Sequence, residues 1–153
     1  MNYEIVTLES KTIAGLSIRT SNHQPDMGAK IGGLWQQLYG QGILAGIPGR
    51  VGQSAFGLYT HYERDADGEY DVIAGCQVQA PVQNDRLVCV EIPAGRYARF
   101  SIVANMHGDG VGALWGDIWN TPLNRAFTVD FEEYLPCEDM EKAPVHIYIA
   151  LAE

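Results

Sequence analysis

The stretch that decides the fold is Ile31-Gly32-Gly33-Leu34-Trp35-Gln36-Gln37-Leu38-Tyr39, because its pattern returns later in the same chain. The second copy is Val111-Gly112-Ala113-Leu114-Trp115-Gly116-Asp117-Ile118-Trp119. Both copies run from a branched residue through a glycine and a small residue to Leu and Trp, and both end on an apolar and an aromatic residue. This apolar spacing predicts an amphipathic helix at each place.

Segments typical of β-strands flank the two predicted helices in the same order. They are residues 3–8, 12–20, 55–63 and 70–79 around the first helix, and residues 87–92, 96–104, 127–135 and 145–151 around the second. Asp67-Gly68 predicts a hairpin turn within the first set, and Ser10-Lys11 predicts a turn near its start. Each half therefore reads strand-strand-helix-strand-strand, which indicates an internal duplication.

This duplication predicts one α+β domain over residues 1–153, made of two repeats at about 1–80 and 87–153. We expect a curved antiparallel sheet with two helices and a pseudo-twofold axis. Two similar halves that bury their apolar faces against each other leave a cleft along that axis, and clefts between subdomains are common ligand sites.

The charge balance restricts the partners of this 153-residue chain. Asp and Glu outnumber Lys and Arg by 19 to 10, and the formal net charge is −9. Because phosphate binding needs clustered basic residues, we expect no direct binding of nucleic acid. The negative charge favours cationic small molecules or basic protein surfaces, although it is also explained by solubility alone.

The cysteines and the hydropathy pattern favour a cytoplasmic location. The chain has an odd number of cysteines, and no two of them form a CxxC motif. They are Cys76, Cys89 and Cys137. The first residues lack the charged and apolar regions of a signal peptide, and no apolar run approaches the ~20 residues of a membrane span.

The strand Thr128-Val129-Asp130-Phe131-Glu132-Glu133-Tyr134-Leu135-Pro136 places carboxylates among aromatic residues. Successive side chains in a strand point to opposite faces, so Glu132 and Glu133 cannot both face the interior. We expect the face of Phe131 to be core, packed on a helix, and Glu132 to face the cleft. A polar face exposed to solvent is the alternative.

Several aromatic residues fall where the two halves are expected to meet, and they suit either core packing or the lining of a pocket for cations. They are Trp35, Tyr39, Tyr59, Trp115, Trp119, Phe131 and Tyr148. Metal binding is poorly supported, because His61-x-Glu63 and His107-x-Asp109 lack a third ligand at a persuasive spacing. With no GxSxG motif, we predict no metal, no cofactor and no catalytic residue.

Five short motifs are spread along the whole chain, namely Met1-Asn2-Tyr3-Glu4-Ile5, Thr12-Ile13-Ala14-Gly15, Trp115, Phe131-Glu132-Glu133-Tyr134-Leu135 and Ile147-Tyr148-Ile149. Their order and spacing resemble the gyrase-inhibitor-like small-molecule-binding superfamily, which includes effector-binding domains of AraC-type and MerR-type transcription regulators. The resemblance implies a pocket between the halves, with Glu132 as its carboxylate and Tyr148 in its wall. His146 stands where members of the family can carry a second acid, which implies either a weaker preference for cations or pH-dependent binding.

We therefore expect a stand-alone effector-binding domain for amphipathic, cationic organic molecules, linked to transcription regulation or drug sequestration and not an enzyme. The predicted ligand-binding residues are Glu132, Tyr148, Tyr59, Trp115, Trp35, Tyr39 and His146. Alternatives are a small hydrolase of electrophilic compounds with Glu132 as general base, and a protein-binding inhibitor with an acidic surface. Pairing of the predicted edge strands between chains would give a homodimer, and a role in transcription regulation would require a regulator partner.

Overall fold

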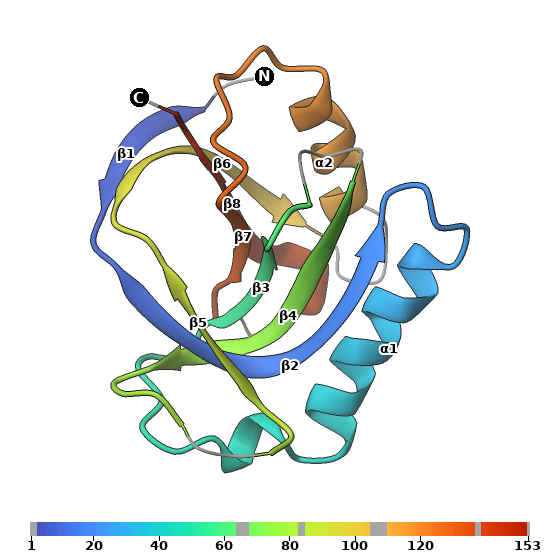
Figure 1. Ribbon diagram of the computed structural model, residues 1–153, viewed down its shortest axis with the longest axis vertical. Helices are drawn as coiled ribbons and strands as arrows, with labels where there is room; N and C mark the ends of the chain where they lie inside the picture. Colours follow the sequence, from blue (N-terminus) through green and yellow to red (C-terminus); the bar gives the residue numbers. More distant parts are fainter. Residues whose placement is uncertain (1–2, 64–67, 83–84, 105–109, 137–138, 153) are drawn as a thin grey trace.

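Two helices and eight strands form the fold in the computed structural model, which describes residues 3–63, 68–82, 85–104, 110–136 and 139–152 (Figure 1). The strands are β1 (Glu4–Leu8), β2 (Lys11–Ser21), β3 (Ala55–Thr60), β4 (Glu69–Val78), β5 (Val88–Ile92), β6 (Gly95–Ala104), β7 (Val129–Tyr134) and β8 (Ala143–Ala150). The helices are α1 (Met27–Gly40) and α2 (Gly110–Trp119), with short 3-10 turns at Leu44–Gly46 and Met140–Lys142. The α+β prediction is confirmed.

All strands belong to one antiparallel sheet, in the order β1-β6-β8-β7-β3-β4-β2-β5. The sheet curls strongly, and both helices lie on the same side of it (Figure 1). The order is symmetric about the central pair of β3 and β7, as a duplicated chain predicts. The limits of the two repeats remain a prediction.

The first strand of each predicted repeat pairs with the other half of the sheet. β1 pairs with β6 and β5 pairs with β2, so neither forms a hairpin with the strand that follows it in the chain. The turn predicted at Ser10-Lys11 therefore does not join paired strands, and Lys11 already belongs to β2. This exchange ties the two halves together.

Inside the curl lies an apolar cluster to which all eight strands contribute, the inner core. It contains Val6, Leu8, Ile13, Phe56, Leu58, Ile73, Val90, Ile92, Tyr97, Val129, Phe131, Tyr148 and Ala150. The Phe131 ring stacks on Tyr148 with 4.5 Å between ring centroids. The prediction that the Phe131 face packs on a helix is wrong, because none of the described residues in this cluster belongs to α1 or α2.

The helices instead cover the opposite face of the sheet. Leu34 and Leu38 of α1 pack on side chains of β2 and β4, and Leu114 and Ile118 of α2 pack on β6 and β8. Between the two helices, the central strands β3 and β7 remain open to a cleft. Glu132 of β7 lies on this helix side, as strand alternation requires once Phe131 faces the inner core.

Among the described residues, no helix is long and apolar enough to cross a bilayer. Cys76 is buried and Cys89 exposed, and both are free thiols. Six residues named above lie outside the described part of the chain, namely Met1, Asn2, Asp67, His107, Asp109 and Cys137.

Candidate functional site

The Glu132 carboxylate lies at the centre of the molecule, and only 3% of the residue is exposed. Three side chains donate hydrogen bonds to it. Tyr134 Oη donates to Oε1 (2.7 Å), while Trp115 Nε1 (2.6 Å) and Tyr59 Oη (3.1 Å) donate to Oε2. Because a tryptophan N–H can only donate, this arrangement suits an ionised carboxylate.

Gly57 makes room for this carboxylate. It stands opposite Glu132 in the pairing of β3 with β7. A Cβ atom on Gly57 would lie 2.9 Å from Glu132 Oε1 and 3.1 Å from the Trp35 ring. The absence of a side chain at Gly57 therefore leaves room for both the Glu132 carboxylate and the Trp35 ring of α1 beside β3.

Burial raises the pKa values of Glu132 and of its two tyrosine donors. Desolvation raises the pKa of Glu132 above its ordinary value, and the hydrogen bonds from Tyr134, Trp115 and Tyr59 oppose that rise. Burial and the nearby Glu132 charge raise the pKa of Tyr59 and of Tyr134 well above that of a free phenol. Both hydroxyls thus stay protonated and keep donating to the carboxylate.

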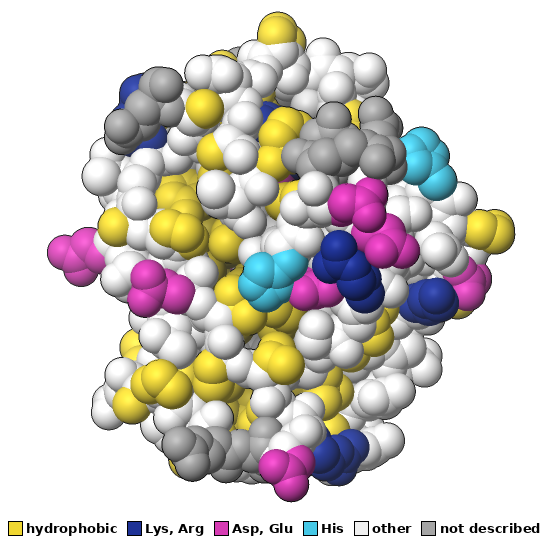
Figure 2. Space-filling model, viewed as in Figure 1, with side chains coloured by type: hydrophobic (Ala, Val, Ile, Leu, Met, Phe, Trp, Pro, Cys, Tyr) yellow, Lys and Arg dark blue, Asp and Glu magenta, His cyan; other side chains and the backbone are white. Residues whose placement is uncertain are grey.

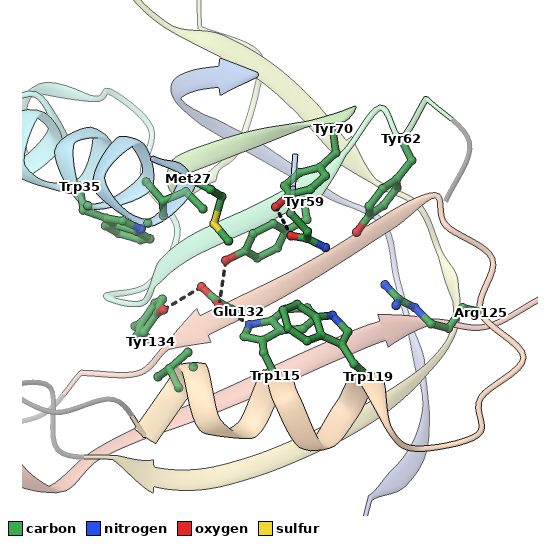
Figure 3. Close-up of a pocket in the computed structure, with 16 residues that line it drawn as sticks. Met27, Trp35, Tyr59, Tyr62, Tyr70, Trp115, Trp119, Arg125, Glu132 and Tyr134 are labelled. Atoms are coloured by element: carbon green, nitrogen blue, oxygen red, sulfur yellow. Dashed lines mark hydrogen bonds between the residues drawn. The ribbon is translucent and has the colours of Figure 1, made fainter. Parts of the chain in front are cut away.

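Glu132 faces a cavity of about 500 Å³ between α1 and α2, the central pocket (Figure 3). Its walls are mainly aromatic and aliphatic. The lining residues are Asn22, Met27, Gly28, Ile31, Gly32, Trp35, Tyr59, Tyr62, Tyr70, Val111, Gly112, Trp115, Trp119, Arg125, Glu132 and Tyr134. A cavity of this size and character suits a drug-sized organic ligand.

Arg125 brings a positive charge to the pocket, at the end opposite Trp35 and Tyr134 (Figure 3). Its Nη2 donates to Asp130 Oδ2 at 2.6 Å, and Tyr62 Oη donates to the same oxygen at 2.6 Å. Asp130 is fully buried. Because this pair neutralises itself, Glu132 is left as the one uncompensated charge among the described residues that line the pocket.

The structure brings together four of the seven residues predicted to bind ligand, since Glu132, Tyr59, Trp115 and Trp35 all line the central pocket. Tyr39 stacks against Trp35 but lies outside this pocket and is 57% exposed.

Tyr148 and His146 lie on the other face of the sheet. Tyr148 belongs to the inner core, and its hydroxyl lies 3.4 Å from His146 Nδ1. Neither residue lines the central pocket or contacts the Glu132 carboxylate. Side chains of a strand alternate between the two faces, and in β8 the neighbours of Tyr148 are the ones that face the helices.

Sequence reasoning missed several lining residues. Strand alternation could have found Tyr134, which shares a face with Glu132. No local signal marked Tyr62, Tyr70, Asn22 or Arg125, because these residues reach the pocket from loops and strand ends distant in the chain.

On the face seen in Figure 2, the coloured Asp and Glu side chains are scattered, and several lie beside Lys or Arg. The coloured part of this face therefore does not present the continuous acidic surface that a mimic of nucleic acid requires. Among the described residues, no group of three or more His, Cys, Asp and Glu could hold a metal ion.

Comparison with known proteins gives a family match over nearly the whole chain. The profile of the Cass2 family, described as integron-associated effector binding protein, matches residues 4–151. The crystal structure of an integron cassette protein from the mobile metagenome of Vibrio cholerae is 34% identical in sequence. The alignment covers 98% of this chain and 95% of that one, with a TM-score of 0.78. The comparison with curated proteins found no match.

More distant structures share the fold. SAV2435 bound to tetraphenylphosphonium is 17% identical over 99% of this chain and 94% of its own, with a TM-score of 0.78. The C-terminal domain of EcmrR is 12% identical over 100% of this chain and 99% of its own, with a TM-score of 0.62.

Proposed function

This chain belongs to the family of integron-associated effector binding proteins, and we propose that it binds amphipathic organic cations in the central pocket. The observation that carries the proposal is the buried Glu132 carboxylate. It accepts three hydrogen bonds, yet it has no cationic partner among the described residues. A buried charge without a counter-ion is costly, and a bound cation supplies that counter-ion.

The aromatic walls favour cations that carry apolar groups. Trp35, Tyr59 and Trp115 surround the carboxylate, and a cation over an aromatic face gains about 0.5–2 kcal/mol per contact. The apolar walls also bury the hydrophobic substituents of the ligand, at roughly 25 cal/mol per Å² of apolar surface. The structure of SAV2435 with tetraphenylphosphonium supports the same class of ligand.

Binding without turnover is the function that the pocket supports better than hydrolysis. Its described lining residues include no Ser, Cys or His, and the Glu132 oxygens are already engaged by three donors. Reversible capture of cations would serve drug sequestration or signalling to a regulatory partner. Incubation with aromatic esters should give no hydrolysis above the rate without protein, and any turnover lost in Glu132→Gln would favour the hydrolase.

Titration with tetraphenylphosphonium tests the proposal, with quenching of tryptophan fluorescence as the signal. Glu132→Gln keeps the shape of the side chain and removes its charge, so we expect at least about tenfold weaker binding, or about 1.4 kcal/mol. Glu133→Gln is the matched control. Glu133 lies next in β7, faces the other side of the sheet, and does not line the central pocket. Equal affinity of wild type and Glu132→Gln would refute the role of the carboxylate.

A further inference from the structure

A second cavity of about 610 Å³ adjoins the central pocket, and we name it the Arg50 cavity. Its described lining residues are Trp35, Tyr39, Leu44, Arg50, Gln53, Ala55, Tyr134, Leu135, Pro136 and Ala143. It lies where β3 begins and β7 ends, because Ala55 pairs with Tyr134 there. The two cavities therefore follow one another along the central strand pair.

Among the described lining residues, two side chains are common to the walls of both cavities. Trp35 and Tyr134 line each of them and touch edge to face, with ring centroids 5.4 Å apart. Figure 3 shows this pair at the end of the central pocket nearest Glu132. These two rings form the partition between the cavities. Because Tyr134 also donates a hydrogen bond to Glu132 Oε1, the partition lies next to the carboxylate.

Arg50 gives the second cavity a charge opposite to that of the first. Its Nη2 donates to the carbonyl oxygens of Gln53 (3.0 Å) and Ser54 (3.4 Å). Its Nε is buried and has no hydrogen-bond partner within the described residues. No ion pair joins Arg50 to a carboxylate in the described part of the chain.

The charge of the Arg50 guanidinium affects the pKa of Tyr39, which lines the cavity. Burial raises the pKa of Tyr39, and the positive charge of Arg50 opposes that rise. The guanidinium therefore lies near the Tyr39 phenol. Arg50 lines the cavity without a carboxylate partner among the described residues, and a carboxylate is the group that pairs best with a guanidinium fork.

We propose that the Arg50 cavity is a second subsite of the same cleft, which binds the carboxylate end of an elongated ligand whose cationic end lies at Glu132. The ligand class is bipolar, with an organic cation, an apolar linker and a terminal carboxylate. The inference rests on the proposed function, since Glu132 anchors the cationic end. The linker passes the partition of Trp35 and Tyr134, whose rings provide apolar contacts for it.

Calorimetric titration with two series of alkyl triphenylphosphonium ions tests this subsite. One series ends in a carboxylate and the other in a methyl group, with matched chain lengths. For chains long enough to pass the partition, wild type should bind the carboxylate form about tenfold more tightly, as a charge-assisted pair allows. Short chains should show no preference. The dependence on length tests the subsite without any variant.

Two variants separate this inference from the proposed function. Arg50→Gln should abolish the preference for the carboxylate form and leave the affinity for the methyl form unchanged. Glu132→Gln should weaken both forms, because it removes the anchor of the cation. The control is Arg96→Gln, which removes the same charge from an exposed residue that lines neither cavity and should keep the preference.

Two results would overturn the subsite. One is equal affinity of wild type for both series at every chain length, and the other is a preference that survives in Arg50→Gln. If Arg50→Gln unfolds, Arg50→Lys keeps the charge without the planar fork and should retain part of the preference. An unaltered affinity in Glu132→Gln would instead refute the proposed function, whatever the effect at Arg50.

Discussion

At the scale of single residues, the site buries the Glu132 carboxylate, and burial of a charge without a counter-ion costs folding free energy. Desolvation raises the pKa of Glu132. The hydrogen bonds from Tyr134, Trp115 and Tyr59 lower it by less, so the pKa stays above its ordinary value. The folded chain therefore holds a proton at Glu132 more tightly than the unfolded chain does. Stability must fall as the pH rises from the ordinary carboxyl pKa through the raised one.

Glu132→Gln removes this pH-dependent cost. We expect the variant to gain stability relative to wild type as the pH rises through that window, and to lose the advantage below the ordinary glutamate pKa. Urea unfolding at a series of pH values measures the difference between the two free energies of unfolding. A difference that stays constant with pH would show that Glu132 has the same pKa in both states.

Gly57→Ala tests the space beside the carboxylate. The added Cβ would lie 2.9 Å from Glu132 Oε1, so the carboxylate must move away from its donors. We expect about tenfold weaker binding of tetraphenylphosphonium, equivalent to about 1.4 kcal/mol, and destabilisation of about 1–3 kcal/mol from overpacking. Gly116→Ala is the control, because its Cβ would meet nothing within 4 Å. Unchanged binding in Gly57→Ala would show that the carboxylate tolerates displacement.

At the scale of elements, both helices deliver tryptophans to the cleft, and the strands between them carry the carboxylate. Trp35 comes from α1, Trp115 and Trp119 come from α2, and β3 and β7 supply Tyr59 and Glu132. This placement depends on the curl of the sheet. β2 and β4 leave no room for a Cβ where Gly15 pairs with Gly75.

Gly75→Ala tests that close approach. A Cβ on Gly75 would collide with the backbone of Ala14, and one on Gly15 with the backbone of Ala74. Because backbone atoms cannot rotate away, we expect Gly75→Ala to lower the free energy of unfolding by at least about 1–3 kcal/mol. Gly46→Ala, with open space around its Cβ, should change stability little. Urea midpoints of the two variants provide the comparison.

At the scale of the whole molecule, the inner core and the exchanged strands β1 and β5 make two similar halves into one unit. All eight strands contribute to the cluster around Phe131 and Tyr148. We therefore expect a single unfolding transition, with far-UV circular dichroism and tryptophan fluorescence changing together.

Phe131→Ala should lower the stability of both halves at once. Phe131 is fully buried, and loss of a buried phenylalanine ring costs about 3–5 kcal/mol. The transition should shift to lower urea concentration while remaining single. Two separated transitions would mean that the halves unfold independently and that the inner core does not couple them.

Much of the fold could be predicted because its signals are local. The paired helix motifs around Trp35 and Trp115, the flanking strands and the alternation at Glu132 all depend on residues close in the chain. The site was predicted less completely. Tyr62 and Arg125 enter the central pocket only through the folded chain, and the face of Tyr148 depends on how β8 pairs with β7.

The sequence by itself determined the order of helices and strands and the similarity of the two halves. It also determined that Glu132 and its neighbour Glu133 face opposite sides of the sheet. Only the tertiary structure decided which face of the sheet the helices cover, because strand alternation distinguishes two faces without saying what packs on either. It also decided the exchange of β1 and β5 and the three donors around Glu132. Those features arise from pairings between residues far apart in the chain, which no local pattern encodes.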